Sequence, residues 1–157
     1  MRESLQTVAV RLARAPALSD AAALAARLLV AALFAPEGWG KIVDYADVQS
    51  YMAQFGVAPQ LAPLAIALEL GGGVALALGV ATRPVALALG VFSLVVAAIF
   101  HGGADVGEVL EFRKDFAIAG GLFALAALGG GAWSLDALAV RWRGRASGRG
   151  RPDLSPP

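Results

Sequence analysis

Apolar residues in this chain fall into four long blocks separated by glycine, proline and charged residues. The blocks run roughly over Leu18 to Ala35, Leu61 to Val80, Val85 to Phe100 and Phe116 to Leu138, the last interrupted by three glycines. Helices of about 17–25 apolar residues are long enough to cross the hydrocarbon core of a bilayer. Isolated strands could not satisfy their backbone groups in lipid. We therefore predict an all-α, polytopic membrane protein, an antiparallel bundle of four transmembrane helices.

The connection after the first block has a second, shorter pattern. Apolar and aromatic residues recur there every three or four positions, at Ile42, Tyr45, Val48, Tyr51, Met52 and Phe55. This spacing predicts an amphipathic helix with an aromatic face. We expect it to lie flat at the membrane interface, where Tyr and Phe bind; the alternative is a lid over a ligand site.

The pattern divides the chain into three parts. Residues 1–17 form a cytoplasmic segment, either a short interfacial helix or a solvated end, and residues 18–140 form the four-helix domain. Residues 141–157 are rich in Arg, Gly, Ser and Pro, which predicts a disordered cytoplasmic tail drawn to anionic lipid. Because this tail directly follows a span, we expect it to contact lipid and no nucleic acid.

The basic residues are distributed unequally between the two sides of the predicted bundle. The side with both termini holds nine of them: Arg2, Arg11, Arg14, Arg83, Arg141, Arg143, Arg145, Arg149 and Arg151. The other side holds Lys41, Arg113 and Lys114. Cytoplasmic loops carry the excess of Lys and Arg, so we expect both termini in the cytoplasm of a multi-pass inner-membrane protein.

Composition narrows the chemistry that the chain could perform. The sequence is 58% hydrophobic and contains no cysteine, which excludes disulfides, thiol redox chemistry and thiolate metal sites within the chain. A single histidine, His101, excludes a multi-histidine metal or haem site within one subunit. We predict no metal site.

Two charged residues interrupt the apolar blocks. Glu69 and Arg27 each lie about eight residues inside a span, on helices that run in opposite directions, which predicts a similar depth near the midplane. An isolated charge there costs about 2.5–3.5 kcal/mol on insertion scales. We therefore predict that Arg27 and Glu69 form an ion pair. The pair would either fix helix register or line a polar cavity for a proton, a quinone headgroup or a small polar ligand.

Further polar residues cluster at the outer ends of the predicted spans. They are Glu37 and Lys41 after the first span, His101 after the third, and Lys114 and Asp115 before the fourth. In an antiparallel bundle these ends meet on one face, so the five side chains could form an outer vestibule above the buried pair. The alternative is ordinary interfacial charge, as loops near membranes are polar.

Small residues recur at helical spacing in two of the blocks. Gly72, Ala75 and Gly79 do so in the second block, and Gly120 and Ala124 in the fourth. Small residues allow helix backbones to approach closely in lipid, so we interpret them as packing surfaces.

Four motifs, in order along residues 20–130, resemble one known family. They are "RLLVAALFAPEGWGKI", "LELGGGVALALGVATRP", the pair Phe100-His101, and "RKDFAIAGGLFAL". Together they are similar to the DoxX family of small bacterial membrane proteins. The resemblance implies a four-helix inner-membrane protein, and it singles out Arg27, Lys41, Glu69, His101, Lys114 and Asp115.

The resemblance implies a redox-linked membrane subunit, because some DoxX-family proteins are linked to thiosulfate:quinone oxidoreductase and others to thiol-redox complexes. Such a subunit would bind a quinone or small polar ligand, or dock an oxidoreductase partner. It would be an accessory subunit rather than a stand-alone enzyme, because a short, cysteine-free chain does not support independent sulfur transfer. Two alternatives stay open: an assembly factor with a buried Arg–Glu lock, and a small proton-coupled transporter, which would require a homodimer.

Overall fold

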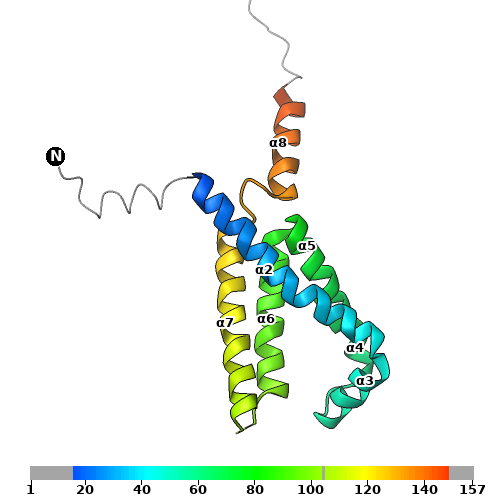
Figure 1. Cartoon of the computed structure of the whole chain (residues 1–157). Helices are drawn as coiled ribbons and strands as arrows, with labels where there is room; N and C mark the ends of the chain where they lie inside the picture. Colours follow the sequence, from blue (N-terminus) through cyan, green and yellow to red (C-terminus); the bar gives the residue numbers. More distant parts are fainter. Residues whose placement is uncertain (1–15, 104, 149–157) are drawn as a thin grey trace, which may run out of the picture.

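The computed structural model describes residues 16–103 and 105–148, and its elements are helical (Figure 1). The long helices are α2 (Pro16–Val43), α6 (Thr82–Phe100) and α7 (Val106–Leu128), with shorter helices α3 (Tyr45–Gln54) and α8 (Leu135–Gly148). A further long helix is composite. It runs through η1 (Pro59–Leu61), α4 (Ala62–Ile66), the π-helical turn η2 (Ala67–Gly71) and α5 (Gly72–Leu78).

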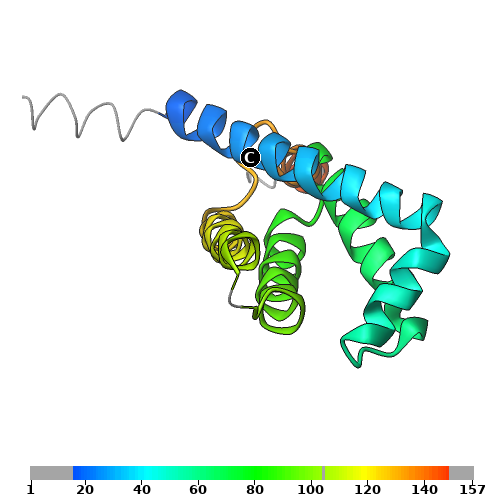
Figure 2. The same ribbon diagram turned by 60° about the horizontal axis from the view of Figure 1, so that its bottom comes forward.

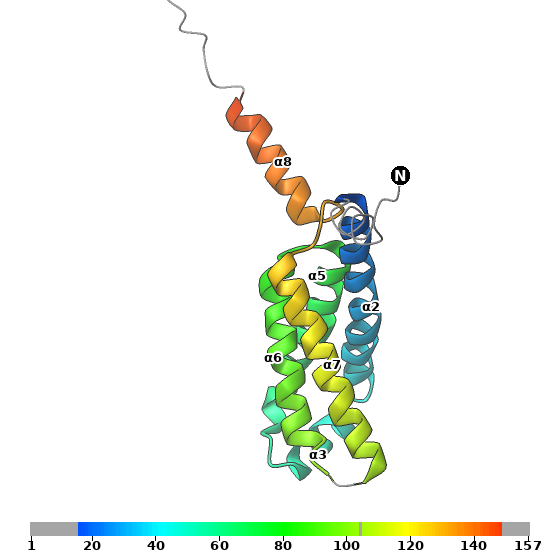
Figure 3. The same ribbon diagram turned by 90° about the vertical axis from the view of Figure 1, so that its left-hand side faces the viewer.

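Four long helical segments pack into one bundle. Helices α6 and α7 lie side by side, and α2 runs along the composite helix and crosses the others obliquely (Figures 1 and 2). Helix α8 stands off one end of the bundle, and α3 covers the opposite end (Figure 3). We name these the α8 end and the α3 end.

Three of the predicted spans are confirmed as helices long and apolar enough to cross a membrane, namely Pro16–Val43, Pro59–Leu78 and Thr82–Phe100. The fold is thus that of an all-α membrane protein. Helix α7 has five charged residues within its first ten positions, Glu108, Glu111, Arg113, Lys114 and Asp115. The fourth span therefore stays a prediction.

Helix α2 extends further than its apolar block predicts. We expected the first span to end near Ala35, but the helix continues through Pro36 to Val43. Packing explains the extension. A methyl group placed on Gly38 would lie 2.5 Å from the backbone nitrogen of Leu70, so this last part of α2 lies directly against the composite helix. The extension carries Lys41 alongside that helix.

The helix predicted in the connection after the first span is confirmed as α3, Tyr45–Gln54. It ends at Phe55, and Gly56 follows with a φ of +73°. This left-handed conformation favours glycine. The chain then turns back at Pro59 into the composite helix, which places α3 over the end of the bundle opposite α8 (Figure 3).

The fourth predicted span differs from the structure at both ends. Helix α7 begins ten residues earlier than expected, at Val106, because Asp105 Oδ1 accepts hydrogen bonds from Gly107 N at 2.8 Å and Glu108 N at 3.1 Å. It ends at Leu128, where Gly129 and Gly131 both have positive φ. The apolar block after these glycines belongs to a separate helix, α8.

The disorder predicted for residues 141–157 is wrong for residues 141–148, which form the second half of α8. Of the predicted N-terminal segment, residues 1–17, the first fifteen lie outside the described residues, as does the remainder of the tail, and residues 16 and 17 begin α2.

The hydrophobic core fills the half of the bundle towards the α8 end. It comprises Phe34, Leu76, Ala86, Leu89, Leu122 and Leu125, from α2, α5, α6 and α7. Gly72 packs there as predicted, since a methyl group on it would lie 3.1 Å from Leu89. Among residues 16–103 and 105–148, no atom of another helix lies within 4 Å of a methyl group placed on Gly120, so its packing role stays a prediction.

The connection between α7 and α8 is held against the bundle by carboxylates. Asp136 accepts hydrogen bonds from the backbone N–H groups of Ala81 and Thr82, both at 2.8 Å, at the start of α6. Asp20 of α2 accepts one from Ala132 N at 2.7 Å. Asp136 thereby satisfies two N–H groups that a helix leaves unpaired at its first turn.

These hydrogen bonds predict an acid sensitivity that depends on Asp136. Burial acts to raise the pKa of this carboxyl group, but hydrogen bonds from Thr82 and Ala81 outweigh it and lower the pKa below the usual 3.8. A lowered carboxyl pKa stabilises the fold above the unfolded-state value, and this contribution is lost as pH falls through the folded-state value. The wild type should thus lose more stability than Asp136→Asn on acidification below about pH 4.

Thermal unfolding of both proteins between pH 3 and pH 7 measures this difference. Equal losses of stability in the two proteins would show that Asp136 does not stabilise the start of α6 through its charge. At neutral pH, Asp136→Ala should cost about 1 kcal/mol, the usual value of a helix cap.

Candidate functional site

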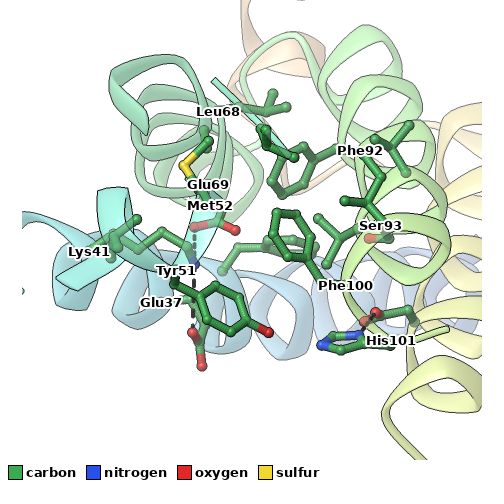
Figure 4. A pocket seen from close by; sticks show the side chains of 18 of the residues that line it. Glu37, Lys41, Tyr51, Met52, Leu68, Glu69, Phe92, Ser93, Phe100 and His101 are labelled. Atoms are coloured by element: carbon green, nitrogen blue, oxygen red, sulfur yellow. Dashed lines mark hydrogen bonds and ion pairs between the residues drawn. The ribbon is translucent and has the colours of Figure 1, made fainter. Parts of the chain in front are cut away.

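The half of the bundle towards the α3 end is hollow. A cavity of about 900 Å³ lies there (Figure 4), at the upper end of the range of about 300–1,000 Å³ that small-molecule sites occupy. Its walls come from α2, α3, the composite helix, α6 and α7. Most of the lining is apolar or aromatic, and the polar groups gather in two places.

The first polar group joins Lys41 to two glutamates. Lys41 Nζ lies 2.7 Å from Glu69 Oε2 and 3.8 Å from Glu37 Oε2. The Glu69 side chain is only 6% exposed, whereas that of Glu37 is 64% exposed. Figure 4 shows Lys41 reaching between the two carboxylates. The buried charge of Glu69 is therefore compensated by a lysine whose ammonium group also borders the cavity.

The predicted ion pair between Arg27 and Glu69 is wrong. Arg27 is fully buried, and its Nη2 donates a hydrogen bond to the backbone oxygen of Trp133 at 2.7 Å. Its other neighbours are at the α8 end, where Gly79 lies so close to the guanidinium that a side chain would not fit. Arg27 thus holds the connection between α7 and α8, away from the cavity that Glu69 lines.

Helix register explains the error. Gly38 lies against Leu70, and Gly73 against Ala35, so Glu69 sits beside the last turns of α2, where Lys41 is. Arg27 is fourteen positions before Lys41, about 21 Å along a helix. With α2 predicted to end near Ala35, Arg27 was placed at the same depth in the membrane as Glu69.

The second polar group lies across the cavity, where α6 ends and α7 passes. His101 Nδ1 is 2.8 Å from Asp115 Oδ2, and Asp115 is 8% exposed. An ionised carboxylate only accepts hydrogen bonds, which assigns the proton to Nδ1 and leaves Nε2 for a further partner. In Figure 4 His101 and the Lys41 group lie on different sides of the Phe100 ring.

The five residues of the predicted vestibule, Glu37, Lys41, His101, Lys114 and Asp115, all line this one cavity. Lys114 pairs with Glu111, which also lines the cavity. Glu69 lines the same space. The sequence therefore selected six of its polar residues, but it divided them wrongly, since Glu69 belongs with Lys41 and Arg27 lies elsewhere. Their roles in function stay predictions.

Aromatic residues close the cavity at the α3 end. The Tyr51 ring of α3 stacks on that of Phe100 of α6, with centroids 5.4 Å apart, and Phe55 contacts both rings. Partial burial, and secondly the charge of Glu108, raise the pKa of Tyr51, so its hydroxyl stays protonated as a donor. The spacing of aromatic residues predicted the aromatic face of α3, but no pattern in the sequence indicated that Phe100 is its partner.

Two further features of the site could not be expected from the amphipathic pattern alone. Glu69 lies in the π-helical turn η2, and such turns are frequent at functional sites. Ser93 of α6 is buried, lines the cavity and donates to Leu89 O at 2.9 Å. Within residues 16–103 and 105–148, no three His, Cys, Asp or Glu side chains gather as a metal site would require.

Chemically, the arrangement suits a flat, largely apolar molecule with hydrogen-bonding groups at separate edges. Lys41 offers a cationic donor on one side, and His101 offers a ring nitrogen on the other. Phe100 lies between them, and Phe92 and Leu68 line another part of the cavity wall (Figure 4).

Comparison with known proteins gives consistent matches. Residues 22–102 match the family model described as DoxX. Inner membrane protein YqjF of Escherichia coli (strain K12) is 44% identical over 122 residues, which cover 77% of this chain and 94% of that protein. Inner membrane protein YphA of the same organism is 34% identical over 121 residues, covering 72% and 86%. No solved structure matches the chain.

Proposed function

Since this chain belongs to the DoxX family, we propose that it is an inner-membrane subunit that binds a quinone headgroup in the cavity at the α3 end and serves an oxidoreductase partner. The name of the E. coli relatives places them in the inner membrane, and three apolar helices of this chain fit that location. The distribution of arginines supports an orientation with both termini in the cytoplasm.

One observation carries the proposal. A cavity of about 900 Å³ with apolar and aromatic walls contains an ion pair, Lys41–Glu69, and a hydrogen-bonded pair, His101–Asp115. Charged residues at membrane depth are costly and are most often retained at functional sites. A benzoquinone ring has apolar faces and carbonyl oxygens at opposite edges. These oxygens match the ammonium group of Lys41 on one wall and Nε2 of His101 on another, which donates a hydrogen bond when the imidazole ring is protonated.

The residues divide the work of holding such a ligand. Lys41, kept in place by Glu69 and Glu37, donates to one carbonyl oxygen, and His101, oriented by Asp115, faces the other. Phe100 and Phe92 contact the ring. A bound quinone supplies two-electron redox chemistry, with electrons from the partner protein. Within the chain, Lys41 and His101 are the groups that can pass protons to oxygen.

Equilibrium binding tests the proposal. A ubiquinone analogue with a decyl tail should bind the purified protein in detergent, and its Kd should rise about tenfold in Glu69→Gln and in His101→Gln. Arg113→Gln is the matched control, because Arg113 is charged and exposed on α7 but does not line the cavity. It should leave the Kd unchanged. Size-exclusion chromatography verifies that each variant stays folded.

Absence of binding to the wild type, or an equal Kd in all variants, would contradict the proposal. The two alternatives predict other results. An assembly factor would lose stability in the site variants without any ligand effect, and a proton-coupled carrier would show substrate-dependent uptake in proteoliposomes that Glu69→Gln abolishes.

A further inference from the structure

The cavity wall is incomplete on one side. Four apolar residues that line the cavity are also exposed on the surface of the bundle: Leu61 at 48%, Leu64 at 66%, Val95 at 47% and Ile99 at 39%. They come from two helices, the composite helix and α6. The rest of the wall comes from α2 and α7, from the core towards the α8 end and from the Tyr51–Phe100 stack at the α3 end, and the other exposed lining side chains there are polar or aromatic, such as Glu37 and Tyr51.

The opening arises from the way the two helices diverge. Towards the α8 end, α5 packs against α6, and Leu89 of α6 contacts Gly72. Towards the α3 end, α4 lies apart from α6 (Figure 1), and α3 reaches α6 only at its end, through the Tyr51–Phe100 stack. The gap between the composite helix and α6 widens on the α4 side of the π-helical turn η2. At this turn the winding of the composite helix changes between α4 and α5.

The position of the opening determines what it faces. Leu64 is five residues from Pro59 at the start of one candidate span, and Val95 is five residues from Phe100 at the end of the next. At about 1.5 Å per residue, both lie roughly 8 Å below the helix ends. An opening at this depth, bordered by exposed leucine and valine, faces acyl chains rather than water.

We propose that the gap between Leu64 and Val95 is a lateral portal, through which a lipid-dissolved ligand with a single long apolar tail enters from the bilayer and keeps its tail outside. The inference rests on the proposed function, and it specifies the class of ligand. The charged groups that recognise the headgroup lie inside, at Lys41–Glu69 and His101–Asp115. A purely apolar ligand would leave them unused, and a water-soluble one would not need an apolar entrance.

The test narrows the portal without altering the polar groups. Leu64→Trp combined with Val95→Trp fills the opening with apolar volume that lipid tolerates. The matched control is Val74→Trp combined with Val91→Trp, because these exposed residues also lie on the composite helix and on α6 but do not line the cavity. Binding of ubiquinone with a long isoprenoid tail, and of the same ring without a tail, is measured for each protein in lipid nanodiscs.

The portal predicts that the Leu64/Val95 variant binds the long-tailed quinone about tenfold more weakly than the wild type does. Its affinity for the tail-less ring should change by less than about twofold. The control variant should bind both molecules as the wild type does. Equal affinities for the long-tailed quinone in the Leu64/Val95 variant and the wild type would overturn the portal while the binding site stands. Failure of both molecules to bind the wild type would overturn the proposed function as well.

A second copy of the chain covering the opening would also overturn the portal. The chain has no cysteine, so Leu64→Cys introduces a single thiol. If the opening faces lipid, no second copy brings another thiol close to it, and the protein should stay monomeric under oxidising conditions. Formation of a disulfide-linked dimer would show that this face is an interface between two copies of the chain.

Discussion

Replacing Lys41 with methionine should destabilise the protein by about 3 kcal/mol, because it leaves the carboxylate of Glu69 buried without a cation. The Glu69 side chain is 6% exposed, and Lys41 Nζ lies 2.7 Å from it. Removing one partner of a buried ion pair costs about 3–5 kcal/mol. The lower end of that range applies here, since the side chain of Lys41 is 27% exposed to solvent. Unfolding in mixed micelles by a denaturing detergent measures the loss.

A double-mutant cycle separates this pair from the pair that the sequence suggested. Glu69→Gln should rescue Lys41→Met, giving a coupling energy of about 2 kcal/mol, because the neutral pair has no unpaired charge. Glu69→Gln and Arg27→Gln should instead add within about 0.5 kcal/mol, as distant sites do. Strong coupling between Arg27 and Glu69, with additivity at Lys41, would refute the assignment of partners.

The second large effect concerns the contact between α2 and the composite helix. Gly38→Ala should cost about 3 kcal/mol, because the added methyl group would lie 2.5 Å from Leu70 N and 2.9 Å from Leu70 Cα. These are backbone atoms, so the two helices themselves must separate. The same separation would widen the cavity and move Lys41 away from Glu69.

Gly40→Ala is the matched control, since Gly40 lies on the same helix with nothing within 4 Å of the added methyl group. There the substitution should stabilise the protein by about 0.5–1 kcal/mol, through the higher helix propensity of alanine. Thermal unfolding of the two variants therefore gives opposite signs. A small effect of Gly38→Ala would mean that α2 does not approach Leu70 so closely.

The fold was largely accessible from the sequence because membrane spans are long and their apolar signal is strong. The aromatic periodicity after the first span likewise predicted α3. The predicted helix boundaries were wrong. The first span was predicted to end before Pro36, but α2 continues to Val43, where Gly38 packs closely against the composite helix. The fourth span was predicted to continue past the three glycines, but the positive φ of Gly129 and Gly131 ends the helix there.

The candidate site was found by residue type but was wrongly paired. Buried charge in an apolar block identifies Glu69, and clustering at helix ends identifies Lys41 and His101. Which cation pairs with Glu69 depends on the register between the two helices. The error in the predicted end of α2 shifted that register, so Arg27 was predicted as the partner in place of Lys41. The carboxylates Asp20 and Asp136, which hold the connection before α8, were missed. Only their position near helix starts could have indicated them.

Photoaffinity labelling tests the central claim, that the cavity binds a quinone ring between Lys41 and His101, most directly. A quinone that carries a photoreactive azido group on its ring would be irradiated with the protein in nanodiscs, and the labelled peptides mapped by mass spectrometry. We predict labelling within residues 92–101 and 48–52, suppressed by excess unlabelled quinone. Labelling confined to surface residues away from the cavity, such as Leu87 and Val91, or unaffected by the competitor, would contradict the account.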